Sequence, residues 1–139
     1  MAVKRIVNVV LGLLIACAGV IVASPAQAAY VPWAWDGSKW TVTNVYRNHE
    51  VTMGYFKPDG EIFGAKDIYG DSLSAVTQWK IGSSSTIHSL WNNNGSGSAW
   101  KTYNGPNIAE GTRVLIRSCN GATGSGFVMN CSDWWSAAA

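Results

Sequence analysis

Short stretches in which apolar and polar residues alternate, separated by turn residues, run through most of the chain after residue 38. In the clearest stretch, SLSAVTQWKI, every second residue from Leu73 to Ile81 falls on one face of an extended strand. Turn clusters such as KPDG, in which Pro58 suits the second turn position, follow at fairly regular spacing. The pattern predicts an all-β fold: a small antiparallel sandwich, of which an immunoglobulin-like arrangement is one form, or a barrel.

A run of Asn, Gly and Ser separates two of these stretches in SLWNNNGSGSAWKTY. The pair Asn94 and Gly95 suits the positive φ angles of a hairpin turn, and Gly97 adds conformational freedom. We therefore predict that residues 89–91 and 99–103 are partner strands, joined by a loop over residues 92–98.

Trp91 and Trp100 lie on the two predicted strands and are expected to pair across them. One interpretation is that both side chains belong to the core and that the loop only connects the strands. The alternative is a sugar-binding loop, in which the three asparagines donate and accept hydrogen bonds beside an exposed ring. Because both tryptophans are predicted on strands and not at the loop tip, we favour burial.

The first residues of the chain have the layout of a secretory signal peptide. Two basic residues precede an apolar stretch, residues 6–23, and small residues follow it. This layout predicts a signal peptide over residues 1–28, with cleavage after Ala28 and a single secreted domain over residues 29–139. Two alternatives stay open, because the apolar stretch is just long enough for an uncleaved membrane anchor and LIAC resembles the lipobox of bacterial lipoproteins. We favour Cys17 as an ordinary residue of the apolar stretch, since apolar residues follow it where a polar tether is expected.

The net charge of +2 comes from the predicted signal peptide. Lys4 and Arg5 account for two of the ten basic residues, so eight basic and eight acidic residues remain after residue 28. A neutral domain without basic clusters has no electrostatic surface for nucleic acid or an anionic membrane. We therefore expect no nucleic-acid partner and no membrane association after cleavage.

Cys119 and Cys131 are the two cysteines of the predicted domain. Outside the cytoplasm such a pair is expected to form a disulfide. Metal binding is the weaker alternative, because two cysteines without companion histidines cannot complete a zinc site. In a tight hairpin centred near Gly124, Cys119 would face residue 129, so residues 120–130 are predicted to form a wide loop or a bulged return.

Several segments of the chain resemble a group of small secreted proteins. They are DGEIFGAKDIYGDSLSAV, LWNNNGSGSAWKTYN and IAEGTRVLIRSC, together with the later Cys-Ser and tryptophan. These proteins are common in filamentous actinobacteria, carry a signal peptide, a β-rich domain and two C-terminal cysteines, and have no established activity. The resemblance covers roughly residues 56–135. It implies a secreted location and a β-rich fold, and it carries over no functional residue.

Motifs of enzymes are nearly absent from the chain. No Gly-x-Ser-x-Gly sequence is present. His49 precedes Glu50, which on a strand would point to the opposite face, so the two do not form an acid–base pair. We interpret His49 and His88 as surface or strand-edge histidines, and we expect no catalytic residue and no cofactor.

A local group of carboxylates is a candidate metal site. Hard cations such as calcium bind several oxygens of one flexible loop, but the spacing of this group does not match an EF-hand, and Lys66 interrupts it. We therefore expect no metal and interpret the group as solvated turn residues: Asp59, Glu61, Asp67 and Asp71.

Tryptophans are the most distinctive feature of the composition, since all eight follow residue 28. Trp40 and Trp79 share faces with apolar neighbours and are predicted to lie in the core. Four others lie near the ends of the predicted domain. They either pack over the sandwich, which we favour, or form an exposed strip that stacks on sugar rings with polar side chains beside it. The candidate ligand-binding residues are Trp33, Trp35, Trp134, Trp135 and Asn93.

These observations predict a secreted, non-catalytic β-sandwich protein that binds a polysaccharide or a protein partner outside the cell. The alternative class is a small secreted enzyme inhibitor, which would present the disulfide-closed residues 120–130 to its target as a preformed loop, or an enzyme of an unrecognised type.

Overall fold

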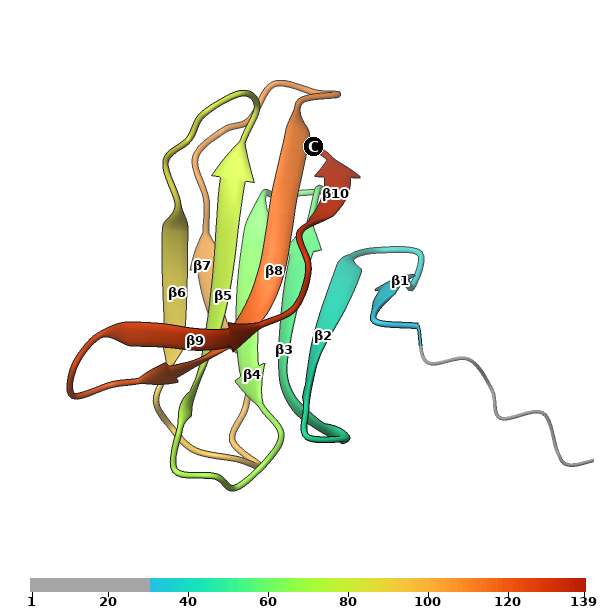
Figure 1. Cartoon of the computed structure of the whole chain (residues 1–139). Coiled ribbons are helices and arrows are strands. Elements are labelled where there is room, and N and C mark those ends of the chain that lie inside the picture. The colour runs from blue at the N-terminus through green and yellow to red at the C-terminus, as the bar shows by residue number, and fades with distance from the viewer. Residues whose placement is uncertain (1–30) are drawn as a thin grey trace, which may run out of the picture.

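The computed structural model describes residues 31–139, which form ten strands in two antiparallel sheets packed face to face (Figure 1). No helix occurs in this part of the chain, and none there is long and apolar enough to cross a membrane. The predicted all-β sandwich is confirmed, and the barrel is excluded because neither sheet closes on itself. The predicted signal peptide and Cys17 lie outside the described residues.

The first sheet is built largely from consecutive hairpins. Its strands, in spatial order, are β1 (Trp33–Trp35), β2 (Trp40–Tyr46), β3 (His49–Lys57), β4 (Ile62–Asp67) and β7 (Lys101–Asn104). A turn joins β3 to β4 as predicted, but it begins at Pro58. The Glu61 N–H donates to the Pro58 carbonyl at 3.1 Å, so Pro58 occupies the first turn position and not the predicted second.

The second sheet contains strands from the remaining parts of the chain. In spatial order they are β10 (Trp135–Ala138), β8 (Arg113–Ala122), β5 (Ser74–Ile81) and β6 (His88–Asn92), and β9 (Phe127–Cys131) pairs with the last residues of β8. The two chain ends of the described region therefore lie on neighbouring edges of the sandwich, with β1 at an edge of one sheet and β10 at an edge of the other.

The apolar core fills one half of the space between the sheets. Trp79 of β5 lies there with only 3% of its surface exposed and stacks on Phe63 of β4 at 4.1 Å between ring centroids. Trp40 is partly buried and packs against the same cluster. The two predicted core tryptophans thus reach the core, and alternate residues of β5 face inward as the pattern predicted. The other large core side chains are Val42, Phe56, Leu90, Ile108, Val114 and Ile116.

The other half of the interior is polar. Along the inward face of β2, Val42 is followed by the buried Asn44, and on β8, Ile116 is followed by the buried Ser118. Hydrogen bonds satisfy part of this interior: the hydroxyls of Thr52 and Ser118 lie 2.8 Å apart across the two sheets.

The predicted hairpin over residues 89–103 is wrong. Its first strand, β6, pairs with β5 in one sheet, whereas its second, β7, pairs with β4 in the other. The side chain of Asn92, which is fully buried, donates to the carbonyls of Ala65 at 3.0 Å and Ala99 at 3.1 Å. These bonds hold the loop where it crosses between the sheets. The expectation of positive φ is confirmed for the two glycines, with +81° at Gly95 and +82° at Gly97, but not for Asn94.

Trp91 and Trp100 consequently do not pair, and neither lies in the core between the sheets. Trp91 covers Gly121 on the outer face of the second sheet, where a β-carbon on that glycine would lie 2.3 Å from the indole ring. Trp100 packs edge-to-face on Tyr55 on the first sheet, at 4.9 Å between ring centroids. Both are half-buried.

The disulfide between Cys119 and Cys131 is confirmed, with 4.0 Å between the two Cα atoms. The strands β8 and β9 form the predicted bulged return, because Cys119 faces Cys131 while Asn120 faces Met129. The additional residue is Asn130, which has a positive φ of +46°.

Candidate ligand-binding groove

Three of the four candidate tryptophans lie close together at the adjacent sheet edges formed by β1 and β10. Trp33 stacks on Trp40 at 4.9 Å with 6° between the ring planes, and on Trp135 at 6.0 Å with 10°. Trp35 packs on Trp40 at 5.1 Å, tilted by 42°. These rings therefore use much of their surface on one another and do not form a coplanar exposed strip, although Trp35 remains 46% exposed.

The other two candidates lie elsewhere. Trp134 has cations over its ring, with Lys80 Nζ at 4.7 Å and Arg117 Cζ at 4.3 Å from the centroid. Asn93 is exposed and follows β6, which is at the opposite edge of the second sheet from β10. The structure thus brings together Trp33, Trp35 and Trp135, and not the full predicted set.

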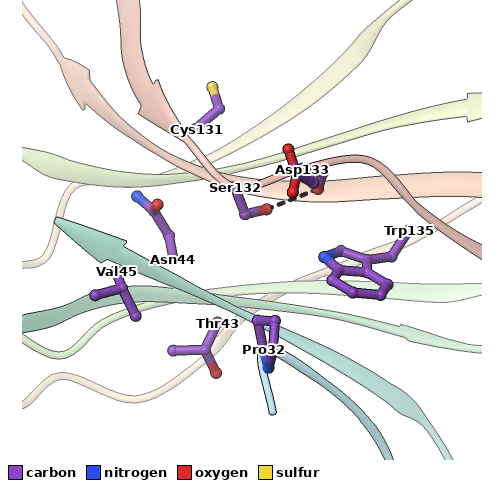
Figure 2. A pocket seen from close by; sticks show the side chains of 8 residues that line it. All are labelled: Pro32, Thr43, Asn44, Val45, Cys131, Ser132, Asp133 and Trp135. Atoms are coloured by element: carbon purple, nitrogen blue, oxygen red, sulfur yellow. Dashed lines mark hydrogen bonds between the residues drawn. The ribbon is translucent and has the colours of Figure 1, made fainter. Parts of the chain in front are cut away.

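Beside Trp135 a groove with a volume of about 240 Å³ opens between β2 and the chain that leads from β9 to β10. Figure 2 shows its lining side chains arranged around a common space. Most of them are polar or small. The residues that line it are Pro32, Thr43, Asn44, Val45, Cys131, Ser132, Asp133 and Trp135.

Backbone and side-chain hydrogen bonds fix both walls of this groove. Ser132 and Ser118 are joined twice, since the Ser132 N–H donates to the Ser118 carbonyl at 2.8 Å and the Ser118 N–H donates to Ser132 Oγ at 3.1 Å. On the other wall, the Thr43 N–H donates to the Pro32 carbonyl at 2.8 Å. Asn44 connects the walls by donating to the Asn130 carbonyl. The groove is therefore a preformed feature that the nearby disulfide supports.

Two polar groups of the groove have no protein partner among residues 31–139. The Trp135 Nε1–H is buried without an acceptor, and it lies on the side of the ring that faces the other groove residues (Figure 2). The exposed carboxylate of Asp133 makes neither a hydrogen bond nor an ion pair in that part of the chain. A buried donor without an acceptor costs about 1–3 kcal/mol, so an acceptor that enters the groove would relieve this cost.

Most residues of the groove were missed in the sequence. Two signals were present: Asn44 occupies an inward position of the stretch WTVTNVY, and Asp133 directly precedes the final tryptophan pair. A polar residue at a predicted core position is a marker of a functional or hydrogen-bonded site. Nothing in the local pattern, however, placed residues 43–45 opposite residues 131–133.

The carboxylates considered for a metal site have different environments. Asp59 is solvated as expected and lies 3.5 Å from Lys57 Nζ. Asp67, in contrast, is only 3% exposed, so its interpretation as a solvated turn residue was wrong. Burial raises the pKa of Asp67, and the charge of nearby Asp71 raises it further, while the Tyr69 N–H donates to it at 3.1 Å and opposes this. The described residues contain no group of three or more His, Cys, Asp or Glu side chains placed to hold a metal ion.

The fold and the groove define a disulfide-bonded β-sandwich with an open, mostly polar cleft at one edge. No family model, curated protein or solved structure matches this chain. The function must therefore be inferred from the groups that the fold brings together.

Proposed function

We propose that the chain is a secreted, non-catalytic protein that binds a polysaccharide in the groove beside Trp135. The observation that carries the proposal is the presence, in one groove, of an unpartnered indole N–H and an unpaired carboxylate, Asp133. A sugar hydroxyl accepts one hydrogen bond and donates another, so it matches an indole donor and a carboxylate acceptor together. The hydroxyls of Thr43 and Ser132 and the amide of Asn44 extend this polar lining.

The shape of the site also supports a polymeric sugar. The groove is open along the edge of the sandwich, and Pro32 and the Trp135 ring add apolar surface that suits the C–H faces of a sugar. The indole nitrogen is itself buried, so a ligand oxygen reaches it only when a neighbouring side chain moves aside. Binding would therefore be accompanied by a small local rearrangement.

Two further points agree with secretion, and one favours a binding protein over a glycosidase. The disulfide fits an oxidising compartment. Glycoside hydrolysis ordinarily uses a pair of carboxylates, and the residues lining the groove include one carboxylate, Asp133, and no histidine. The signal peptide and the resemblance to small secreted actinobacterial proteins remain predictions in agreement with this proposal.

The proposal is tested by retention of the mature protein on chitin, cellulose and peptidoglycan. Trp135→Phe removes the indole donor, and Asp133→Asn removes the carboxylate. Each substitution should weaken binding to the polymer that retains the protein about tenfold. This is the affinity lost with one hydrogen bond that is charged or whose protein partner would otherwise stay unpaired. Asp59→Asn is the matched control, because Asp59 is exposed and does not line the groove. Unchanged retention of both groove variants, with wild-type melting temperatures, would contradict the proposal.

A second candidate function, binding of a protein such as a target enzyme, rests on the β8–β9 hairpin. Phe127 is 62% exposed at the start of β9, and the disulfide closes the base of the hairpin. In Figure 1 the tip of this hairpin extends beyond the edge strand β6. An exposed aromatic residue on a preformed loop suits an inhibitor. If this is its role, the protein inhibits an extracellular protease at stoichiometric concentration and Phe127→Ser abolishes the inhibition.

A further inference from the structure

A second cavity, of about 290 Å³, lies between the β2–β3 turn and the chain that joins β4 to β5. We call it the tyrosine pocket, after Tyr46 on the first side and Tyr69 on the second. His49 stacks on Tyr69 at 4.8 Å between ring centroids, and the buried Val51 and the half-buried Leu73 add aliphatic surface. The pocket therefore offers aromatic faces at its rim and an apolar wall suited to methylene groups.

One carboxylate of this pocket is held in place. Asp71 Oδ1 accepts from the Leu73 N–H at 2.9 Å, and its Oδ2 accepts from Asn120 Nδ2 at 3.1 Å. Both bonds leave further lone pairs on the carboxylate free. Asp71 is thus a preorganised acceptor beside aromatic rings.

The surroundings of Asp71 contain an excess of acceptors. The buried Asp67 lies close enough for the two charges to repel, and Asn120 Oδ1 is buried with no hydrogen-bond partner among the described residues. Neither Asp67 nor Asp71 takes part in the two salt bridges found in residues 31–139, which are Lys39–Asp36 and Lys57–Asp59. A positively charged donor is the group that this region lacks.

The chain's own cation at the pocket is Arg47. It is exposed on the β2–β3 turn, and its Cζ lies 5.1 Å from the centroid of the Tyr46 ring. This arrangement shows that a ring of the pocket already attracts a cation. Arg47 leaves the Asp71 carboxylate without an ion pair, and its positive charge opposes the binding of another cation.

We propose that the tyrosine pocket binds a primary ammonium group on an aliphatic stem, which is the chemistry of a lysine side chain. The ammonium group pairs with Asp71 beside the rings of Tyr69 and His49, and the methylenes of the stem lie against Val51 and Leu73. A carboxylate with aromatic neighbours is a suitable site for such a cation. This site shares no residue with the groove, so it does not depend on polysaccharide binding.

The first test is an NMR titration of the ¹⁵N-labelled mature protein with Nα-acetyl-lysine methylamide. The amides of residues 46–51 and 69–73 should shift, and the neutral Nα-acetyl-norleucine methylamide should bind at least about tenfold more weakly, because it lacks the charged hydrogen bond. 1,5-Diaminopentane separates two sources of the same group. Tighter binding of the lysine derivative indicates a peptide ligand, and tighter binding of the diamine indicates a free amine. Equal affinity for the norleucine derivative, or no shifts in the pocket, overturns the proposal.

Variants make the test specific to the pocket. Asp71→Asn should weaken binding of the lysine derivative about tenfold. Tyr69→Leu alters an exposed side chain and should weaken binding roughly two- to fivefold through the lost ring, which keeps the test valid if Asp71→Asn unfolds. Arg47→Ala should strengthen binding, because a like charge is removed. The control Asp59→Asn should change nothing. Weaker binding by Arg47→Ala, or wild-type binding by a folded Asp71→Asn or Tyr69→Leu variant, contradicts the assignment.

Discussion

Asn92 offers the sharpest test of how the two sheets are joined. Its amide donates to the carbonyls of Ala65 and Ala99 and accepts from the Asn94 N–H at 3.2 Å, and the side chain is fully buried. Asn92→Asp keeps the shape and the acceptor but replaces the donor by an oxygen. Asn92→Leu removes both functions at similar volume.

The magnitude follows from the hydrogen bonds that are lost. Two donated bonds at about 1–1.5 kcal/mol each give a loss of at least about 2–3 kcal/mol for either substitution, and Asn92→Leu also loses the bond accepted from the Asn94 N–H. Asn92→Asp costs more at neutral pH, because a buried carboxylate faces two carbonyl oxygens. These neighbours raise the pKa of the introduced carboxyl group in the folded state above its unfolded value. Its protonated form is therefore favoured by folding, so the variant should recover stability as the pH falls and lose it as the pH rises.

Urea unfolding followed by tryptophan fluorescence measures these differences at pH 7 and pH 4. Asn93→Asp is the control, since Asn93 is the exposed neighbour and receives the same change of charge. We expect Asn93→Asp to unfold like the wild type and Asn92→Asp to be the least stable variant at pH 7. Wild-type stability of Asn92→Asp at pH 7, or the same loss at both pH values, would refute this account of the inter-sheet connection.

Three further predictions concern stability. Reducing the Cys119–Cys131 bond, which spans a sequence separation of 12, should lower the free energy of unfolding by about 3 kcal/mol through loop entropy. Calorimetry should then show a melting temperature lower by about 10 °C or more, and a shift within error would contradict this prediction. Asp67→Asn should stabilise the protein at pH 7, because the pKa of Asp67 is raised in the folded state. This gain in stability should vanish when the pH falls below the ordinary aspartate pKa of 3.8. A loss of stability at pH 7, measured by urea unfolding, would contradict this prediction. Gly54→Ala should destabilise by about 1–3 kcal/mol, since its β-carbon would lie 2.6 Å from the buried Thr77 hydroxyl, and wild-type urea stability would argue against that clash.

The strands were predictable because period-two alternation is a local property of the sequence. In β5 the inward residues Ala75, Thr77 and Trp79 are those that the pattern placed on one face. The partner of each strand is not a local property. The glycines of the 92–98 loop do adopt left-handed angles, as expected, yet the buried bonds of Asn92 carry the loop from one sheet to the other. The sequence does not show whether an asparagine in a glycine-containing loop, such as Asn92, is a turn residue or a buried residue that holds the loop.

The candidate site was predictable only in part for the same reason. Composition and position drew attention to Trp33 and Trp135, and the structure stacks them on each other. Their contact depends on β1 and β10 reaching adjacent edges of the sandwich, which follows from the topology of both sheets. Asp133 was not singled out, because the sequence does not show that residues 131–133 lie opposite residues 43–45. The tyrosine pocket likewise joins residues from two separate turns.

The most direct test of the central claim, polysaccharide binding in the groove, is the NMR signal of the Trp135 indole N–H. Its ¹⁵N–¹H cross-peak is assigned by its absence in Trp135→Phe. Soluble oligosaccharides derived from whichever polymer retains the protein are then added. If the groove binds sugar, the cross-peak moves downfield in a saturable way, because the indole donor gains an acceptor, and the backbone amides of residues 43–45 and 131–133 move with the same affinity. The contrary result is that oligosaccharides of a polymer that retains the protein bind saturably without shifting this cross-peak or these amides. In that case the sugar binds elsewhere, and the assignment of the groove is contradicted.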